Sequence, residues 1–305
     1  MKKFKRAGSV FLTAVMMGVL VFGCSSNEDE KRADAKDGAK TEVQDAEDEG
    51  AEEPAKLLVA AAASLEYSME EKLIPLFEEQ NPGVKVEGSY DSSGKLQTQI
   101  EEGMEADLFF SAATKQMNAL TEEGYIKEDG EKKLLENKIV AIVPKDSDLE
   151  INGFEDLVKA DTIALGDPAS VPAGQYAREA LTSLDLWDAV SAKASFGTNV
   201  TEVLNWVAEG SADAGVVYAT DAAARAEDVE VKAEAPEGSL EKPVIYPAAI
   251  LERTEHSEEA EAFLTFLQSE EAGEIFEEYG FTPYKEAEET ETETETNAAS
   301  EEVSE

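Results

Sequence analysis

The chain has 305 residues, enough for one large domain or two medium-sized ones, and its 42% of hydrophobic residues can form a core. Its 68 acidic residues outnumber the 26 basic ones, which gives a formal charge of −42. Nucleic acid is excluded as a partner, because binding to its phosphates requires a basic surface.

The first 23 residues have the pattern of a signal peptide. An apolar run from Val10 to Phe22 follows four basic residues, Lys2, Lys3, Lys5 and Arg6. An uncleaved membrane anchor is the alternative, but the run is shorter than the roughly 20 residues of a spanning helix. The sequence VFGC contains the single cysteine, Cys24, and resembles a bacterial lipobox. This resemblance implies cleavage before Cys24, a lipid on its thiol, and a protein anchored to the outer face of the cell membrane.

Two acidic segments flank the body of the chain. Residues 24–56 contain no aromatic residue and little that is apolar, and we expect a disordered tether between lipid and domain. Residues 286–305, with the sequence EAEETETETETNAASEEVSE, are expected to be a second disordered segment. The body between them has 47 acidic and 18 basic residues over 56–285, which predicts an acidic, solvated surface.

Within the body, a short apolar strand, a turn of small or polar residues and an amphipathic helix recur in that order. The sequence LLVAAAAS leads into the first such helix, whose apolar positions are Leu65, Met69, Leu73 and Phe77. Pro75 lies inside this helix and predicts a kink or an end near Ile74. The alternation of strands and helices predicts an α/β fold with mostly parallel sheets that carry helices on both faces.

Small and hydroxyl residues occupy several junctions at which a strand ends and a helix begins. These junctions are Ser64, Ser92 with Ser93, Pro172 to Gly174, and Asn199 with Val200. In α/β sheets such junctions are where ligands bind, and helix N-termini there offer N–H groups to anions. The alternative for each serine taken alone is a helix cap. The recurrence of these junctions favours an oxyanion site.

Enzyme classes find little support in the sequence. The only histidine, His256, precedes a helix in an acidic stretch, and no GxSxG, GxxxxGK[ST] or GxGxxG motif is present. The abundant carboxylates form no EF-hand spacing. We therefore expect no catalytic residues, no cofactor and no resident metal ion.

Five stretches together resemble the molybdate-binding proteins of bacterial ABC importers over roughly residues 57–284. They are AAAASL, DSSGKLQTQIEEGMEADLFFSA, GDPASVPAGQYAREAL, GVVYATDA and EIFEEYGF. The resemblance implies a two-lobed, type II periplasmic binding protein, with lobe 1 formed by 57–142 and 246–285 and lobe 2 by 143–245. The chain would then cross between the lobes near 141–144 and near 243–247.

The resemblance also implies which residues hold the anion. Ser64 and Ser93 would act through hydroxyl and N–H groups, Ala173 and Val200 through backbone N–H groups, and Tyr218 through its phenol. Ser92 competes with Ser93 for the same role. The family pattern has a third hydroxyl residue where this chain has Gly94, which predicts a more mobile loop.

The expected ligand is molybdate or tungstate, so that molybdenum is present only within the oxyanion. Both anions only accept hydrogen bonds, and no Asp or Glu is expected inside the cluster, although Asp91 and Asp167 lie near it. The implied partner is an ABC permease in the membrane, and we expect a monomer. Sulfate or a carboxylate could replace molybdate on the same fold. A serine hydrolase and an adhesive surface lipoprotein are the alternatives from other classes.

Overall fold

The computed structural model describes residues 54–286 of the chain. The signal segment, Cys24, the acidic tether up to residue 53 and the acidic segment from residue 287 lie outside these residues. No helix among residues 54–286 is both long enough and apolar enough to cross a membrane.

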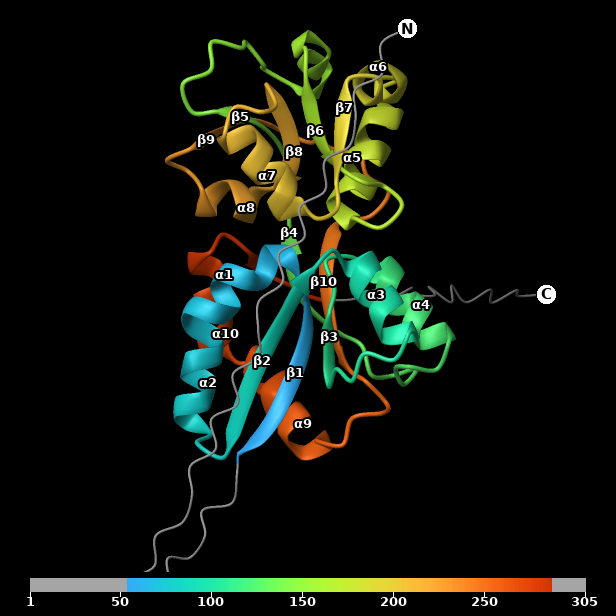
Figure 1. The fold of residues 1–305 in the computed structure, drawn as a ribbon, viewed down its shortest axis with the longest axis vertical. Coiled ribbons are helices and arrows are strands. Elements are labelled where there is room, and N and C mark those ends of the chain that lie inside the picture. The colour runs from blue at the N-terminus through green and yellow to red at the C-terminus, as the bar shows by residue number, and fades with distance from the viewer. Residues whose placement is uncertain (1–53, 287–305) are drawn as a thin grey trace, which may run out of the picture. The chain divides into compact units, whose positions relative to one another are not determined.

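The first of two sheets has six strands in the order β11-β4-β10-β3-β1-β2 (Figure 1). β1 runs parallel to β2 and β3, whereas β10 runs antiparallel to β3 and β4. β11 is also antiparallel to β4 and closes this edge of the sheet. The strands are β1 (Ala55–Ala62), β2 (Val84–Asp91), β3 (Leu108–Phe110), β4 (Lys132–Asn137), β10 (Val244–Ile250) and β11 (Thr282–Pro283).

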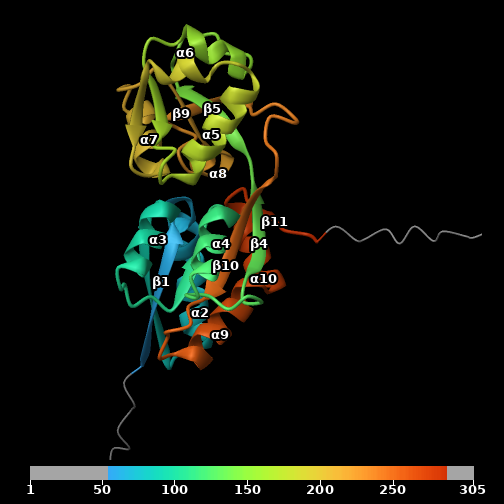
Figure 2. The ribbon, with the colours of Figure 1, turned by 90° about the vertical axis from the view of Figure 1, so that its right-hand side faces the viewer.

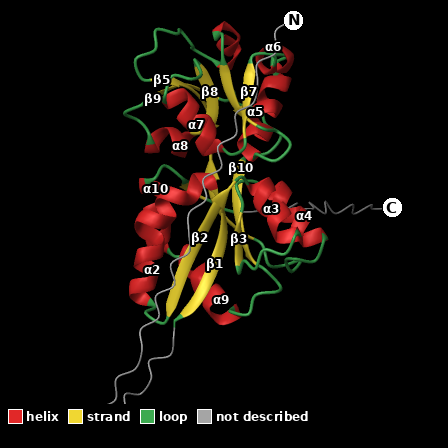
Figure 3. Ribbon diagram, viewed as in Figure 1, coloured by secondary structure: helices red, strands yellow, loops and turns green. Residues whose placement is uncertain are grey.

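Helices cover both faces of the first sheet (Figure 3). Side chains alternate between the faces along a strand, so Val59 of β1 packs in one apolar cluster while its neighbour Ala60 packs in another. The cluster of Ala60 is shared with α3 (Ser93–Glu101) and α4 (Thr114–Glu122), and that of Val59 with α2 (Ile74–Gln80), α9 (Ser257–Leu267) and α10 (Glu270–Glu278).

The predicted break near Ile74 takes the form of a π-helical turn. The chain passes from α1 (Glu66–Ser68) through this turn (Met69–Leu73) into α2. Pro75 has no N–H to donate within the helix, and a π turn changes the hydrogen-bond spacing without ending the helix. Met69, Leu73 and Phe77 remain buried on one face, as their spacing predicts.

The second sheet has five strands in the order β7-β6-β8-β5-β9. β6 runs parallel to β7 and β8, while β5 runs antiparallel to β8 and β9. The strands are β5 (Ile139–Pro144), β6 (Ile163–Gly166), β7 (Ala194–Gly197), β8 (Ala214–Tyr218) and β9 (Val229–Glu234). The helices of this part are a 3₁₀ segment (Phe154–Lys159), α5 (Pro172–Ser183), α6 (Trp187–Ser191), α7 (Val200–Ala208) and α8 (Ala219–Ala224).

We call residues 54–137 with 244–286 the first lobe and residues 139–234 the second lobe, because each set builds one sheet. The chain changes sheets at Lys138, the single residue between β4 and β5, and again within 235–243. These crossings differ from the boundaries at 142/143 and 245/246 expected from the sequence. The run from Ile139 to Pro144 pairs as one strand with β8 and β9, so it cannot be divided between lobes. Ala55 and Lys56, expected in the tether, pair with Val84 and Lys85 in β1.

Both sheets are mixed and not mostly parallel as the sequence predicts, because only four of the nine strand pairings are parallel. The antiparallel pairings all involve β5 or β10, the strands that follow the two crossings, or the short closing strand β11. After each crossing, the next strand runs antiparallel to its neighbours in the sheet. The alternation of strands and helices in the sequence does not indicate this direction.

Candidate anion-binding site

The first lobe places Ser64 and Ser93 at the ends of neighbouring strands. Ala62 at the end of β1 pairs with Asp91 at the end of β2, so the two strands end side by side at the same edge of the sheet. Ser64 lies in a 3₁₀ turn directly after β1, and Ser93 is the first residue of α3. Both serines are buried. The first lobe therefore holds these two buried hydroxyl residues at the same edge of its sheet.

Each of these two serines has a defined hydroxyl contact. The Ser64 Oγ and the Tyr246 Oη lie 2.9 Å apart and share a hydrogen bond, while the Ser93 Oγ accepts the N–H of Ala112 at 3.0 Å. Accepting a bond leaves the Ser93 hydroxyl proton able to donate elsewhere. The Ser93 N–H also has no acceptor within its own helix, because it belongs to the first turn.

The second lobe places Ala173 and Val200 in the first turns of helices. Ala173 is the second residue of α5 and follows β6, whereas Val200 is the first residue of α7 and follows β7. β6 and β7 are parallel and end together, with Gly166 paired to Gly197. Gly174 allows α5 to sit directly on the end of β6, since a Cβ at this position would lie 2.1 Å from the Gly166 oxygen.

Tyr218 ends β8 and reaches from the second lobe to the first. Its ring packs edge-on against Tyr246 of β10, with 5.5 Å between the ring centres, and its hydroxyl donates to the Ala112 oxygen at 3.5 Å. Ala112 thus contacts Ser93 through its N–H and Tyr218 through its carbonyl. The structure therefore brings Ser64, Ser93 and Tyr218 together, linked by Tyr246 and Ala112.

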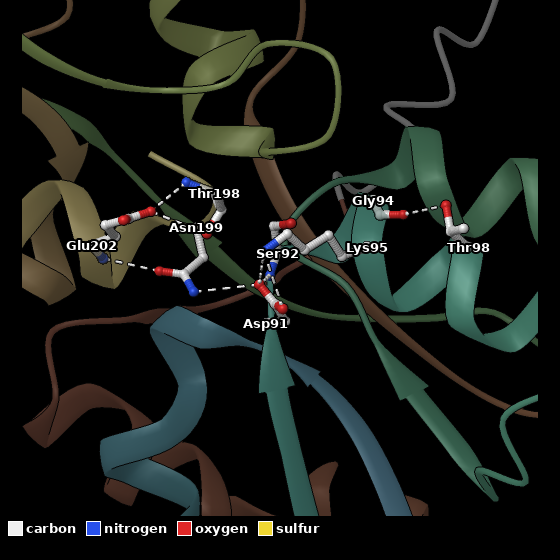
Figure 4. Close-up of polar contacts among 8 residues, drawn as sticks. All are labelled: Asp91, Ser92, Gly94, Lys95, Thr98, Thr198, Asn199 and Glu202. Atoms are coloured by element: carbon white, nitrogen blue, oxygen red, sulfur yellow. Dashed lines mark hydrogen bonds and ion pairs between the residues drawn. The ribbon is translucent and has the colours of Figure 1, made fainter. Parts of the chain in front are cut away.

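Ala173 and Val200 are tied to the same cluster through their chain neighbours. Ser170, three residues before Ala173, accepts the N–H of Gly94 at 2.9 Å. Asn199, directly before Val200, donates its side-chain amide to the Asp91 Oδ1 at 3.3 Å (Figure 4). Both contacts join the two lobes. Within residues 54–286, no hydrogen bond joins Ala173 or Val200 to Ser64, Ser93 or Tyr218.

Gly94 does not have the role expected from the sequence. A Cβ at position 94 would lie 2.3 Å from the Ser170 oxygen, so only glycine permits this approach of the two lobes. Its N–H is held by Ser170, and its carbonyl accepts the Thr98 hydroxyl at 3.1 Å (Figure 4). The prediction of a more mobile loop is not supported by these contacts.

Asp91, expected near the cluster, ends β2 directly before Ser92 and accepts several hydrogen bonds. It accepts the Ser92 N–H at 2.8 Å and the Asn199 amide, and its carboxylate lies 3.3 Å from the Lys95 Nζ (Figure 4). The Asn199 Oδ1 accepts the Glu202 N–H at 2.9 Å and so caps α7. Asp91 therefore anchors both helix N-termini while Lys95 balances its charge.

Ser92 remains a competitor of Ser93. Its side chain is buried, yet its Oγ has no hydrogen-bond partner among residues 54–286. A buried hydroxyl without a partner is costly, and a hydrogen-bonding ligand would remove that cost.

The site phenols stay protonated at neutral pH. Burial raises the pKa of Tyr218 and of Tyr246 well above the ordinary value, so both keep a hydroxyl proton to donate. Asp221 accepts the backbone N–H of Tyr218 at 3.1 Å, and burial raises the pKa of its carboxyl to about 7. The cluster is thus rich in neutral donors.

Several contributors to this cluster carry no signal in the sequence. Tyr246, Ala112 and Asn137 become neighbours of the expected residues only through strand pairing; the Asn137 amide donates to Tyr246 at 3.2 Å and to Thr220 at 2.9 Å. His256 precedes α9 and donates its N–H to Thr254, away from the cluster. Within 54–286, no group of three or more His, Cys, Asp or Glu side chains could hold a metal ion.

Two helix-flanked sheets joined by two crossings, with hydroxyl and N–H groups gathered between them, define a two-lobed binding protein of type II. Residues 57–282 match the bacterial extracellular solute-binding protein family, and the chain belongs to this family. Substrate-binding proteins of ABC transporters work outside the cytoplasm with permease components in the membrane.

Individual relatives agree with this assignment. A Bacillus subtilis protein named "Putative ABC transporter substrate-binding lipoprotein YvgL" is 39% identical over 274 residues, or 90% of this chain and 97% of the relative. The molybdate-binding protein ModA of Haemophilus influenzae is 37% identical over 233 residues, which cover 75% of this chain and 90% of that protein. A solved structure titled "substrate binding domain of putative molybdenum ABC transporter from Clostridium difficile" is 38% identical, with a TM-score of 0.59, and covers 76% of this chain and 100% of that one.

Proposed function

We propose that this protein captures molybdate, or tungstate, between its two lobes and delivers it to the permease of an ABC importer. The proposal is supported by the names of its relatives, two of which refer to molybdate or molybdenum. The anion would be held by Ser64 and Ser93 from the first lobe and by Ala173, Val200 and Tyr218 from the second.

The observation that carries the proposal is the buried, uncharged donor cluster that spans both lobes. Ser64, Ser93 and Tyr218 meet through Tyr246 and Ala112, and all three are buried. Molybdate is fully deprotonated near neutral pH and only accepts hydrogen bonds. Neutral donors at short range in a dry site act at a low effective dielectric constant, so they can bind an anion in a protein with a strongly negative net charge.

The same cluster disfavours a protonated oxyanion such as monohydrogen phosphate. Such a ligand has a proton to donate and needs an acceptor in the site. Two carboxylates adjoin the cluster, and both already accept hydrogen bonds from the protein: Asp91 accepts from Ser92 and Asn199 and faces Lys95, and Asp221 accepts the backbone N–H of Tyr218. A fully ionised oxyanion is the better match for the remaining groups.

Further parts of the proposal concern residues outside the described range. Lipid attachment at Cys24 would hold the protein on the outer face of the cell membrane, and the acidic tether would let the lobes reach the permease. We also propose that the protein acts as a monomer and binds its ligand without turnover.

Isothermal titration of the chain from residue 25 to 305 with molybdate tests the proposal. We expect tight one-to-one binding that excess sulfate does not displace, and no response to phosphate. Displacement by sulfate at comparable concentration would transfer the function to sulfate uptake on the same fold. If none of these anions gives a heat of binding, the protein is not an oxyanion receptor.

A further inference from the structure

A surface groove of about 700 Å³ lies beside the closing edge of the first sheet and contains none of the five expected anion-binding residues. Figure 2 shows the strands that border it, β11, β4 and β10, next to one another. Its lining includes Lys132 and Lys133 at the start of β4, Lys242 just before β10, and Tyr284 after β11.

The three lysines of this groove have no carboxylate partner among residues 54–286. Of the eighteen basic side chains in this range, eight form ion pairs within it, and the three groove lysines are among the ten that do not. Lys132, Lys133 and Lys242 are exposed, and the Lys133 ammonium lies 5.6 Å from the centre of the Tyr284 ring.

The carboxylates of the groove do not cancel this charge. The lining has two acidic residues, Glu131 and Glu286, against three lysines, and neither carboxylate forms an ion pair with these lysines within residues 54–286. Three unpaired cations therefore concentrate positive potential at one place on an acidic body.

The end of the described chain lies in this groove. The N–H of Tyr284 donates to the Leu134 oxygen at 2.8 Å, which fixes the chain to β4 just after β11. Glu286, the last described residue, belongs to the lining. The following residues, 287–305, contain eight glutamates and no lysine or arginine.

We propose that the acidic segment 287–305 docks in the groove through Lys132, Lys133 and Lys242. Exposed ion pairs are individually weak, but attachment at Glu286 gives the segment a high effective concentration at the groove. Several pairs can form together, because glutamates alternate with threonines over 289–295. The acidic segment before β1 is the weaker candidate, since it joins the described chain at the start of β1, and no residue of β1 lines this groove.

Paramagnetic relaxation enhancement tests the docking. A nitroxide is attached at Ser300→Cys in the chain from residue 24, in which Cys24→Ser leaves one thiol. We expect the amide signals of residues 131–133, 242, 244 and 245 to broaden at low salt. They should sharpen at 1 M NaCl, where the Debye length is only about 3 Å and ion pairs are screened. Uniform broadening over the body, or broadening centred elsewhere, would overturn the proposal.

Two comparisons make the test specific. The triple variant K132Q/K133Q/K242Q should lose the local broadening, whereas K85Q/K127Q/K159Q, which removes three paired surface lysines, should keep it. In a mixture of nitroxide-bearing chains without isotope label and isotope-labelled chains without nitroxide, we expect no broadening. Broadening in that mixture would assign the groove to a second molecule and overturn docking within one chain.

Discussion

Asp221 should make the stability of the protein depend on pH in a direction opposite to that of most surface carboxylates. Its carboxyl is buried beside Tyr218, and burial raises its pKa from 3.8 to about 7. The folded state therefore binds a proton more tightly than the unfolded state. Linkage then requires the contribution of Asp221 to the free energy of unfolding to fall as the pH rises from about 4 to about 7, and to level off above that range.

The size of this effect follows from the shift of the pKa. A shift of about three units corresponds to about 4 kcal/mol between the protonated and ionised forms. Asp221→Asn removes the titration while its amide oxygen can still accept the Tyr218 N–H. We expect the variant to gain up to about 4 kcal/mol relative to the parent chain between pH 4 and pH 8.

Urea unfolding of both chains at pH 4 to 8 and constant ionic strength measures this difference. Other carboxylates titrate equally in both chains, so their contributions cancel. Asp213→Asn is the matched control in the same lobe, because hydrogen bonds from Thr162 lower the pKa of Asp213. Its difference from the parent should stay nearly constant between pH 5 and pH 8, because a lowered pKa places the titration of Asp213 below about pH 4. A constant difference for Asp221→Asn would mean that Asp221 is ionised at ordinary pH values, and would refute the reasoning.

Three further predictions concern the site and the anchor. Ser93→Ala should weaken molybdate binding by about 1–3 kcal/mol, or about 5- to 150-fold in calorimetry, while Ser183→Ala in the last turn of α5 should leave it unchanged. Gly94→Ala should weaken binding by a similar factor and enlarge the radius of gyration in solution scattering, because its Cβ would meet the Ser170 oxygen; an unchanged radius would contradict the proposed contact. Cys24→Ser should move the protein from the membrane fraction to the soluble fraction, and its retention as an unprocessed chain would refute lipid anchoring.

The sequence predicts local features of this fold well. Apolar spacing gives the buried face of the first helix, and Pro75 marks where a π turn precedes it, although the helix does not end there. The junctions at Ser64 and Ser93 follow from strand and helix patterns alone, because a helix that starts where a strand ends needs few distant contacts to be recognised.

Features that depend on pairing between distant strands are not predictable in this way. The run Ile139–Pro144 has the same apolar pattern whichever sheet it joins, so its place in the second sheet could not be read from its residues. Tyr246 in β10 and Ala112 just after β3 have nothing in their own residue types that marks them as part of the cluster. They join the cluster because β10 lies between β3 and β4, which brings residues more than a hundred positions apart into contact.

Ala173 and Val200 stand at helix N-termini and present peptide N–H groups that exist for nearly every amino acid. Genetic screens that replace side chains will therefore pass over them: an alanine scan leaves Ala173 unchanged and removes only methyl groups from Val200. Replacing the backbone amide itself by an ester, through chemical synthesis or expanded-code translation, is the perturbation that addresses such positions. Amino-acid substitutions at these two positions during evolution can likewise leave the backbone N–H groups in place, so two proteins with different residues there can keep the same donors.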